Sequence, residues 1–259
     1  MTERTSVATK PVWVDLSSPD PAASREFYAN LFGWEVTVSP DPQYGGYALA
    51  KSNGKDVAGI GPTMAPDSPA AWLIHLGTDD VERVARDVEA AGGRIIAPVM
   101  QVGDQGRMAV FQDPTGAFIS AWEAGAMSGF AGGAPNAFGW AELSARGIDR
   151  AIPFYEQVFG WTHRTSPMGE GQPPYIEFLL DGESIAGGQE MQPMVPAEVP
   201  SYWLAYFAVQ DVDGTYQRAL AAGAREMLPP MDFPGGRFGI VGDPQGAAFG
   251  ILRMNPRPA

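Results

Sequence analysis

The sequence predicts an α+β protein built from two tandem copies of one domain, each copy being a pair of βαβββ modules. Two observations support this prediction. A set of short motifs occurs twice along the chain, at a nearly constant offset. Within each copy, the pattern of apolar residues changes from strand to helix and then to several strands. Helices that lie on one side of largely antiparallel strands are typical of the α+β class.

The repeat defines the domain organisation. Its order and spacing place the first domain at residues 11 to 124 and the second at residues 138 to 254. Residues 125 to 137 between them are glycine and other small residues for the most part, which suits a flexible linker. The paired motifs are Trp13-Val-Asp-Leu with Trp140-Ala-Glu-Leu, Phe27-Tyr28 with Phe154-Tyr155, Gly33-Trp34 with Gly160-Trp161, and Asp113-Pro114-Thr115-Gly116 with Asp243-Pro244-Gln245-Gly246.

Local signals predict the elements of the first copy. Asp20 and Pro21 are typical of a helix start, and Gly33 is a plausible stop. Asn53-Gly54 predicts a hairpin turn. A second, amphipathic helix over 79–91 ends at Gly92-Gly93. The expected strands are 11–16, 35–38, 47–52, 57–62, 72–77, 94–98, 108–112 and 117–123.

Composition excludes several classes of function. The chain has 17 basic and 30 acidic residues, a formal charge of −13, which repels nucleic acid and anionic lipid. We therefore expect neither a nucleic-acid partner nor a membrane partner. No segment has the apolar length of a signal peptide or a membrane span, so we expect a soluble, cytoplasmic protein. The absence of cysteine excludes disulfides, thiolate nucleophiles and cysteine metal sites.

These motifs resemble the vicinal oxygen chelate superfamily, which includes glyoxalases, bleomycin resistance proteins and extradiol dioxygenases. The resemblance rests on the Phe-Tyr helix, the Gly-Trp that follows it, the Gly-Gly helix end and the Asp-Pro-x-Gly turn, and it covers nearly the whole chain. The pattern is also similar to a two-domain actinobacterial subgroup labelled glyoxalase-like or hydroxylase. The resemblance implies that the modules form an open mixed β-barrel whose concave face holds a ligand.

The same resemblance implies where a divalent metal ion would bind in family enzymes. A zinc, iron, nickel or manganese site needs three or four imidazole or carboxylate groups. This sequence does not offer them at those positions, so we expect no metal site and no cofactor. The implied positions hold Trp13 and Trp140 on the first strand of each copy, Leu73 and Leu204 on the fifth, Ser120 and Gly250 on the eighth, and residues near Ile60 and Gly188 on the fourth.

Asp15 and Glu142 leave an alternative open. Each lies two residues beyond a tryptophan, so strand periodicity places both side chains on the same face as the tryptophans. A shifted alignment would make them metal ligands. Otherwise they accept hydrogen bonds from a bound molecule, or pair with an arginine such as Arg107 or Arg237.

Side chains at every second position of a strand point to the same face. Applied to the strands that hold the implied metal positions, this period predicts a mostly apolar, aromatic ligand-binding wall. An alternative interpretation makes the tryptophans simple core residues. His75 is either an acid–base group or a structural histidine, and the two arginines either clamp a ligand or pair with nearby acids. The predicted wall comprises Trp13, Asp15, Leu73, His75, Ser120 and Trp122 in the first copy, and Trp140, Glu142, Leu204, Tyr206 and Gly250 in the second. Arg107 and Arg237, which follow glycines at matching places in the two copies, are added to the candidate ligand-binding residues.

Two classes of function follow. The favoured one is metal-independent binding of a small, largely apolar or aromatic molecule, such as an antibiotic or another secondary metabolite, as in bleomycin resistance proteins. The alternative is a metal-free enzyme of secondary metabolism, a hydroxylase, cyclase or isomerase, with His75, Asp15 or Glu142 as acid or base. A metal-dependent glyoxalase-type lyase is disfavoured. The expected partner is a small-molecule ligand, and the protein is either a monomer with two pseudo-symmetric domains or a homodimer.

Overall fold

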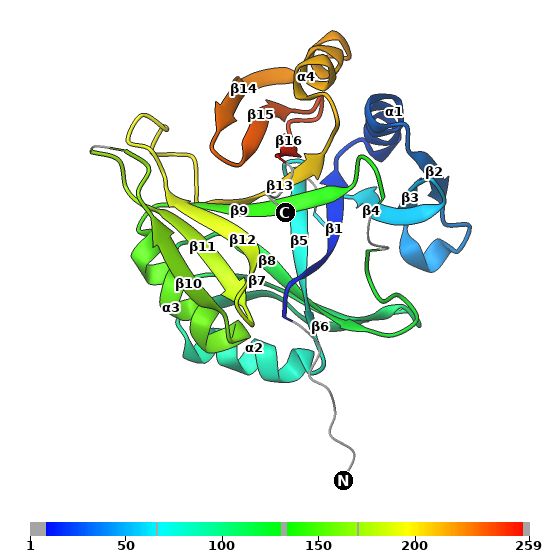
Figure 1. Cartoon of the computed structure of the whole chain (residues 1–259). Coiled ribbons are helices and arrows are strands. Elements are labelled where there is room, and N and C mark those ends of the chain that lie inside the picture. Colours follow the sequence, from blue (N-terminus) through cyan, green and yellow to red (C-terminus); the bar gives the residue numbers. More distant parts are fainter. Residues whose placement is uncertain (1–8, 66, 131–133, 170, 256–259) are drawn as a thin grey trace. The chain divides into compact units, whose positions relative to one another are not determined.

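The computed structural model describes residues 9–65, 67–130, 134–169 and 171–255. Each copy contains two successive βαβββ modules, as the sequence predicts (Figure 1). The first copy consists of β1 (Pro11–Ser18), α1 (Pro21–Phe32), β2 (Glu35–Val38), a short 3₁₀ turn (Pro42–Tyr44), β3 (Ala48–Ser52), β4 (Lys55–Pro62), β5 (Ala71–Thr78), α2 (Val81–Ala90), β6 (Arg94–Val102), β7 (Gly106–Gln112) and β8 (Phe118–Ala124). The second copy consists of β9 (Phe138–Ala145), α3 (Ile148–Phe159), β10 (Thr162–Ser166), β11 (Tyr175–Leu180), β12 (Glu183–Glu190), β13 (Tyr202–Ala208), α4 (Val212–Ala221), β14 (Arg225–Phe233), β15 (Gly236–Gly242) and β16 (Ala248–Met254).

In the part of the chain that the structure describes, the strands form two eight-stranded mixed sheets with the same strand order. The first sheet runs β2-β3-β4-β1-β5-β8-β7-β6, and the second runs β10-β11-β12-β9-β13-β16-β15-β14. In each module the first and last strands are parallel, as in β1 with β4 and β5 with β8, while the hairpin partners are antiparallel. The predicted α+β class and the paired βαβββ modules are therefore confirmed.

Contacts divide the chain into two compact units, and each unit takes one module from each copy. Of the described residues, those within 9–12, 74–129 and 141–203 form unit 1, which contains α2 and α3. The described residues within 13–73, 130–140 and 204–255 form unit 2, which contains α1 and α4. The sequence repeat runs along the chain, whereas the compact units join modules from different copies.

A buried Trp–Tyr–Asp chain lies at the centre of unit 2. Trp72 Nε1 donates to the Tyr28 hydroxyl at 3.0 Å, and that hydroxyl donates to Asp243 Oδ2 at 3.0 Å. The other oxygen of Asp243 accepts from the backbone N–H groups of Gln245 and Ala247, which closes the Asp-Pro-x-Gly turn. We call this hydrogen-bonded chain the clamp of unit 2.

Unit 1 contains the same clamp. Trp203 Nε1 donates to the Tyr155 hydroxyl at 2.6 Å, which donates to Asp113 Oδ2 at 3.0 Å. Burial first, and then the nearby Asp113 charge, raises the pKa of Tyr155 well above its ordinary value, so the phenol stays protonated and remains a donor. In both units, the tyrosine of a Phe-Tyr motif therefore donates a buried hydrogen bond to the aspartate of an Asp-Pro-x-Gly motif.

The Gly-Trp motifs anchor the segments that precede β1 and β9. In unit 2, Trp34 Nε1 donates to the Asn136 carbonyl at 2.8 Å, and Asn136 Nδ2 donates to the Phe32 carbonyl at 2.8 Å. In unit 1, Trp161 Nε1 donates to the Thr9 carbonyl, and the Thr9 hydroxyl donates to the Phe159 carbonyl at 2.6 Å. Asn136 and Thr9 thus donate to carbonyls at the C-terminal ends of α1 and α3 that have no partner within the helix.

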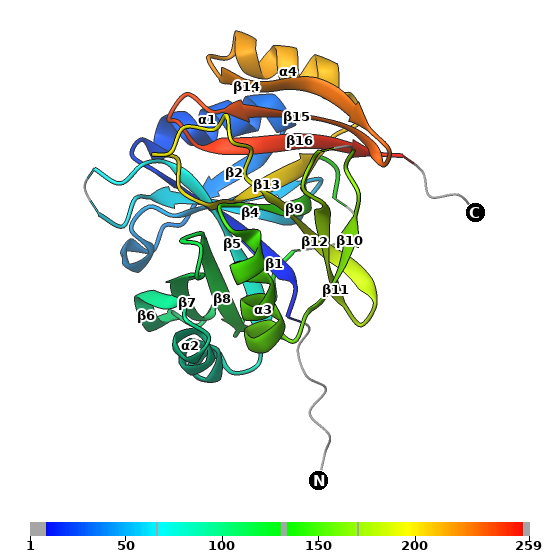
Figure 2. The same ribbon diagram turned by 90° about the vertical axis from the view of Figure 1, so that its left-hand side faces the viewer.

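Local signals locate the helix ends correctly. Asp20 accepts a hydrogen bond from the Ala23 N–H, and Gly33 adopts the left-handed conformation with φ of 71°. Figure 2 shows α4 lying across β14, β15 and β16. None of the helices in the described part of the chain is long and apolar enough to span a membrane.

Of the strands in the first copy, β6 extends furthest beyond its predicted range. β6 continues past the expected end at Pro98 to Val102. It is an edge strand, and its register with β7 shifts between Ile95 and Ala97 and again between Ala97 and Met100. Proline lacks an N–H group, and an irregular edge strand tolerates that loss.

Candidate functional site

A carboxylate on β1 is held by two aromatic donors in unit 2. Trp13 Nε1 donates to Asp15 Oδ1 at 2.9 Å, and the Tyr47 hydroxyl donates to the same oxygen at 2.5 Å. Trp13 and Asp15 therefore share one face of β1, as strand periodicity predicts. Trp13 is only 2% exposed, whereas Asp15 and Tyr47 are partly exposed. We call these three residues the first cluster.

Gly59 on β4 makes the first cluster possible. β4 lies between β3 and β1 in the sheet, and Gly59 pairs with Asp15. A Cβ atom at Gly59 would lie 1.8 Å from the Tyr47 hydroxyl and 2.1 Å from Asp15 Oδ1. The tyrosine thus reaches the carboxylate across a strand that has no side chain at the crossing point.

Electrostatics keeps Tyr47 in its donor form. Burial raises the pKa of Tyr47 well above its ordinary value of 10.0, and the Asp15 charge and its hydrogen bond raise it further. The phenol therefore stays protonated near neutral pH and donates to Asp15. A charge-assisted hydrogen bond of this kind contributes about 1.5–3 kcal/mol, and it fixes the carboxylate before any ligand arrives.

The second copy repeats this arrangement in unit 1. The Tyr175 hydroxyl donates to Glu142 Oε2 at 3.0 Å, and Gln189 Nε2 donates to Glu142 Oε1 at 3.0 Å. Glu142 pairs with Gly187 on β12, the counterpart of Asp15 with Gly59. We call Glu142, Tyr175 and Gln189 the second cluster, which has a longer acid and an amide where the first copy has Gly61.

His75, Ser120 and Trp122 lie close together in unit 1. His75 is 1% exposed, pairs with Ser120 in the parallel register of β5 with β8, and meets the Trp122 ring edge-on at 6.3 Å. Ser120 Oγ donates to the Ala109 carbonyl at 2.9 Å, and Trp122 Nε1 donates to the Met127 carbonyl at 2.9 Å. The three predicted residues are thus brought together inside the protein.

The matching positions of the second copy hold a tyrosine and a glycine in unit 2. Tyr206 pairs with Gly250, and a Cβ atom at Gly250 would lie 2.0 Å from Tyr206 Cδ1. The tyrosine ring therefore fills the space that a side chain at position 250 would need. Leu204 is 3% exposed, whereas Leu73 and Trp140 are partly exposed.

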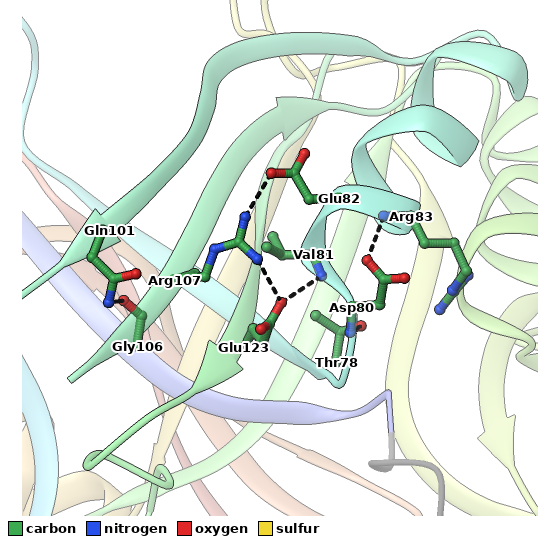
Figure 3. Close-up of polar contacts among 9 residues, drawn as sticks. All are labelled: Thr78, Asp80, Val81, Glu82, Arg83, Gln101, Gly106, Arg107 and Glu123. Atoms are coloured by element: carbon green, nitrogen blue, oxygen red, sulfur yellow. Dashed lines mark hydrogen bonds and ion pairs between the residues drawn. The ribbon is translucent and has the colours of Figure 1, made fainter. Parts of the chain in front are cut away.

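Both predicted arginines pair with acidic side chains. Arg107 contacts Glu82 Oε1 at 2.6 Å and Glu123 Oε2 at 3.5 Å, and the same Glu123 oxygen accepts from the first N–H of α2, at Val81 (Figure 3). Arg237 contacts Asp213 at 2.7 Å and Asp232 at 3.0 Å. Of the two interpretations of these arginines, pairing with neighbouring acids accounts for the contacts observed.

The residues at the positions that the family resemblance implies for metal ligands do not fit a divalent ion. The Trp13 indole is a hydrogen-bond donor with no lone pair for a metal, and it donates to Asp15. Ser120 uses its hydroxyl on a backbone carbonyl, and Gly250 has no side chain. Across residues 9–65, 67–130, 134–169 and 171–255, no group of three or more His, Cys, Asp and Glu side chains is placed to hold a metal ion.

Sequence reasoning missed Tyr47, Tyr175 and Gln189, which donate to the two cluster acids. The expected strand 47–52 includes Tyr47, but none of these three residues belongs to the predicted wall. The signal was present in the repeat, because the two tyrosines occupy matching places before β3 and at the start of β11. His163 is exposed and its Nδ1 contacts Glu156 Oε1 at 2.7 Å.

Comparison with known proteins identifies the domain type. Residues 10–120 and 137–251 match the family model described as "Glyoxalase/Bleomycin resistance protein/Dioxygenase superfamily". The chain is 40% identical over 256 residues to "Putative glyoxylase CFP32" of Mycobacterium tuberculosis (strain CDC 1551 / Oshkosh), covering 95% of each chain. It is 38% identical over 259 residues to "Anthracycline biosynthesis protein DnrV" of Streptomyces peucetius, covering 94% of this chain and 93% of that protein.

Solved structures share the fold at much lower identity. The Mn(II)-bound glyoxalase from Novosphingobium aromaticivorans superposes with a TM-score of 0.64 at 18% identity, covering 96% of this chain and 83% of that one. The 2,3-dioxygenase LapB from Pseudomonas sp. KL28 gives a TM-score of 0.65 at 15% identity, covering 97% and 95%. At these identities the likeness concerns the fold alone.

Proposed function

Since the chain belongs to the glyoxalase, bleomycin resistance protein and dioxygenase superfamily, we propose that it binds a small, largely apolar or aromatic molecule without a metal ion. One observation carries the proposal. In both copies a tyrosine holds a carboxylate two residues beyond the family's first-strand metal position, and that position itself holds an indole.

The chemistry of these side chains suits recognition. A carboxylate fixed by a phenol is a preorganised acceptor for a hydroxyl or ammonium group of a ligand. An aromatic side chain beside it offers apolar contact to a flat molecule. Metal-dependent chemistry would need ligands that indole, leucine and glycine do not provide. The relatives named for anthracycline biosynthesis, from Streptomyces, favour a secondary metabolite as the ligand.

A metal-free enzyme is the second candidate. The observation in its favour is the hydrogen bond between Tyr47 and Asp15, because a phenol and a carboxylate joined by a hydrogen bond are a potential acid–base pair. Glu142 and Tyr175 form the corresponding pair. In this alternative, the bound molecule is isomerised or cyclised by proton transfer rather than released unchanged.

Titration of tryptophan fluorescence with an anthracycline aglycone tests the proposal. The protein is first dialysed against a chelator and analysed for metal content. We expect saturable quenching that is the same with and without the chelator, and chromatographic recovery of the aglycone unchanged. Tyr47→Phe removes the hydroxyl that holds Asp15, so affinity should fall about fivefold to tenfold.

Tyr44→Phe is the matched control, because it removes a phenol hydroxyl from the same loop and should leave affinity within about twofold. Absence of quenching in the unmodified protein rejects binding of this ligand class. Quenching that needs a stoichiometric transition metal rejects metal independence. Conversion of the aglycone, lost on Asp15→Asn, supports the enzyme instead.

A further inference from the structure

The segment between the two copies is held against the first copy at several points. Gly125 N and Met127 N donate to the Gln105 carbonyl at 2.8 and 3.1 Å, and Trp122 Nε1 donates to the Met127 carbonyl. Further along, Asn136 bonds with Phe32 and Trp34. The conformational freedom expected of a glycine-rich linker is therefore restricted at Gly125, Met127 and Asn136.

Gly129 brings this segment close to β1. Its φ is +107°, a conformation that favours glycine, and a Cβ atom there would lie 2.5 Å from the Val12 carbonyl oxygen. Only glycine allows the backbone to pass at this distance. The next residue, Phe130, then meets Trp13 with ring centroids 5.5 Å apart.

Phe130 belongs to a row of three aromatic rings in unit 2. Beyond Trp13, it stacks on Phe138 with a centroid distance of 5.1 Å and an interplanar angle of 9°. Phe130 and Phe138 are each partly exposed, whereas Trp13 is nearly buried. The indole N–H of Trp13 faces Asp15 and Tyr47, while its ring contacts Phe130.

Trp13 therefore contacts both the phenyl ring of Phe130 and the carboxylate of Asp15. We propose that Phe130 is a specificity-determining residue of the first cluster, which therefore takes planar, fused-ring molecules that carry a hydroxyl or ammonium group. This inference rests on the proposed binding function. A fused ring system is large enough to cover the phenyl ring while its donor group meets the carboxylate.

Affinity measurements with two probes test this assignment. The fused-ring probe is an anthracycline aglycone, and the single-ring probe is catechol. Phe130→Ala should weaken aglycone binding about tenfold and change catechol binding less than about twofold. Phe130→Tyr keeps the ring and should retain aglycone affinity. Phe118→Ala, which removes an exposed phenyl ring of β8 that is 47% exposed, is the matched control.

Gly129→Ala provides a second, independent variant. It keeps all three rings but displaces the segment from β1, so aglycone affinity should fall as in Phe130→Ala. Unchanged aglycone affinity in both folded variants overturns the role of Phe130 and leaves the proposed binding function intact. An equal loss for aglycone and catechol also overturns it. If the unmodified protein binds neither probe, the binding function itself fails.

Discussion

The clamps and the carboxylate clusters differ in how closely the two copies agree. Both clamps use the same three residue types, Trp72, Tyr28 and Asp243 in unit 2 and Trp203, Tyr155 and Asp113 in unit 1. The clusters keep the tyrosine, but they exchange aspartate for glutamate and glycine for glutamine. The repeat is therefore strict where it holds the core together, and it varies where a ligand would be recognised.

Burial explains this difference. The clamp tyrosines are fully buried, and a buried donor or acceptor that loses its partner costs about 1–3 kcal/mol. Asp15 and Glu142 are partly exposed, so solvent moderates the cost of a change in side-chain length. Variation at the clusters therefore costs the fold less than variation at the clamps, and under the proposed function it would change ligand selectivity.

Removing a clamp carboxylate should have the largest effect. Asp243→Ala and Asp113→Ala each leave a buried tyrosine and two or more turn donors without an acceptor, so each should lower the free energy of unfolding by about 3 kcal/mol. Urea denaturation measures this loss. Asp20→Ala, which removes an exposed helix cap, is the control and should cost about 1 kcal/mol. Clearly unequal losses in the two clamps would contradict their equivalence.

Adding a methyl group at Gly59, where the Tyr47 side chain crosses β4 to reach Asp15, should have a smaller effect on stability. In Gly59→Ala the new methyl group collides with the ends of two side chains, so Tyr47 moves away from Asp15 and the hydrogen bond is lost. We expect a loss of about 2 kcal/mol in denaturation, together with loss of aglycone quenching.

Gly61→Ala is the matched substitution for Gly59→Ala, since its Cβ would lie 3.2 Å from Tyr47 Cδ2. It should cost less than Gly59→Ala and preserve quenching. Equal behaviour of the two alanine variants would mean that the crossing at Gly59 does not position the tyrosine.

Neutralising each cluster acid compares the two copies as ligand sites. Asp15→Asn and Glu142→Gln keep the size of the side chain and remove its charge. We expect about a tenfold loss of aglycone affinity, roughly 1.4 kcal/mol, for Asp15→Asn, because the aromatic row adjoins that acid. For Glu142→Gln we expect a loss below about threefold. If calorimetric titration instead shows the larger loss of affinity for Glu142→Gln, the main ligand site lies in the second copy.

The pH dependence of stability should give the smallest effect. Burial raises the pKa of Asp243 above its ordinary value of 3.8, and the Ala247 N–H and Tyr28 hydrogen bonds offset only part of that rise. Between the two pKa values the folded chain retains a proton that the unfolded chain has lost. Stability contributed by this group is therefore present below pH 3.8 and is lost as pH rises through the folded pKa.

Asp243→Asn removes this titration while keeping the shape of the side chain. Denaturation midpoints measured on either side of pH 4 should therefore fall less steeply with rising pH in the variant than in the unmodified protein. An identical slope in the two proteins would mean that Asp243 titrates as an unperturbed carboxyl group.

The sequence alone determined the elements and their order. Asp20 with Pro21, Gly33, and Asn53-Gly54 act over a few residues, so they predict helix ends and a hairpin turn without knowledge of the fold. The repeat predicted that the same order of elements occurs twice along the chain, as the strand orders of the two sheets show. Strand period also placed Trp13 and Asp15 on one face, which the hydrogen bond between them confirms.

Only the tertiary structure decided which modules form a compact unit and which side chains complete the clusters. Tyr47 reaches Asp15 from 32 residues away, across a strand that intervenes only after the sheet has formed. Phe130 reaches Trp13 because Gly129 lets a segment between the copies approach β1. Such contacts depend on strand order and backbone approach, which no local pattern of residues encodes.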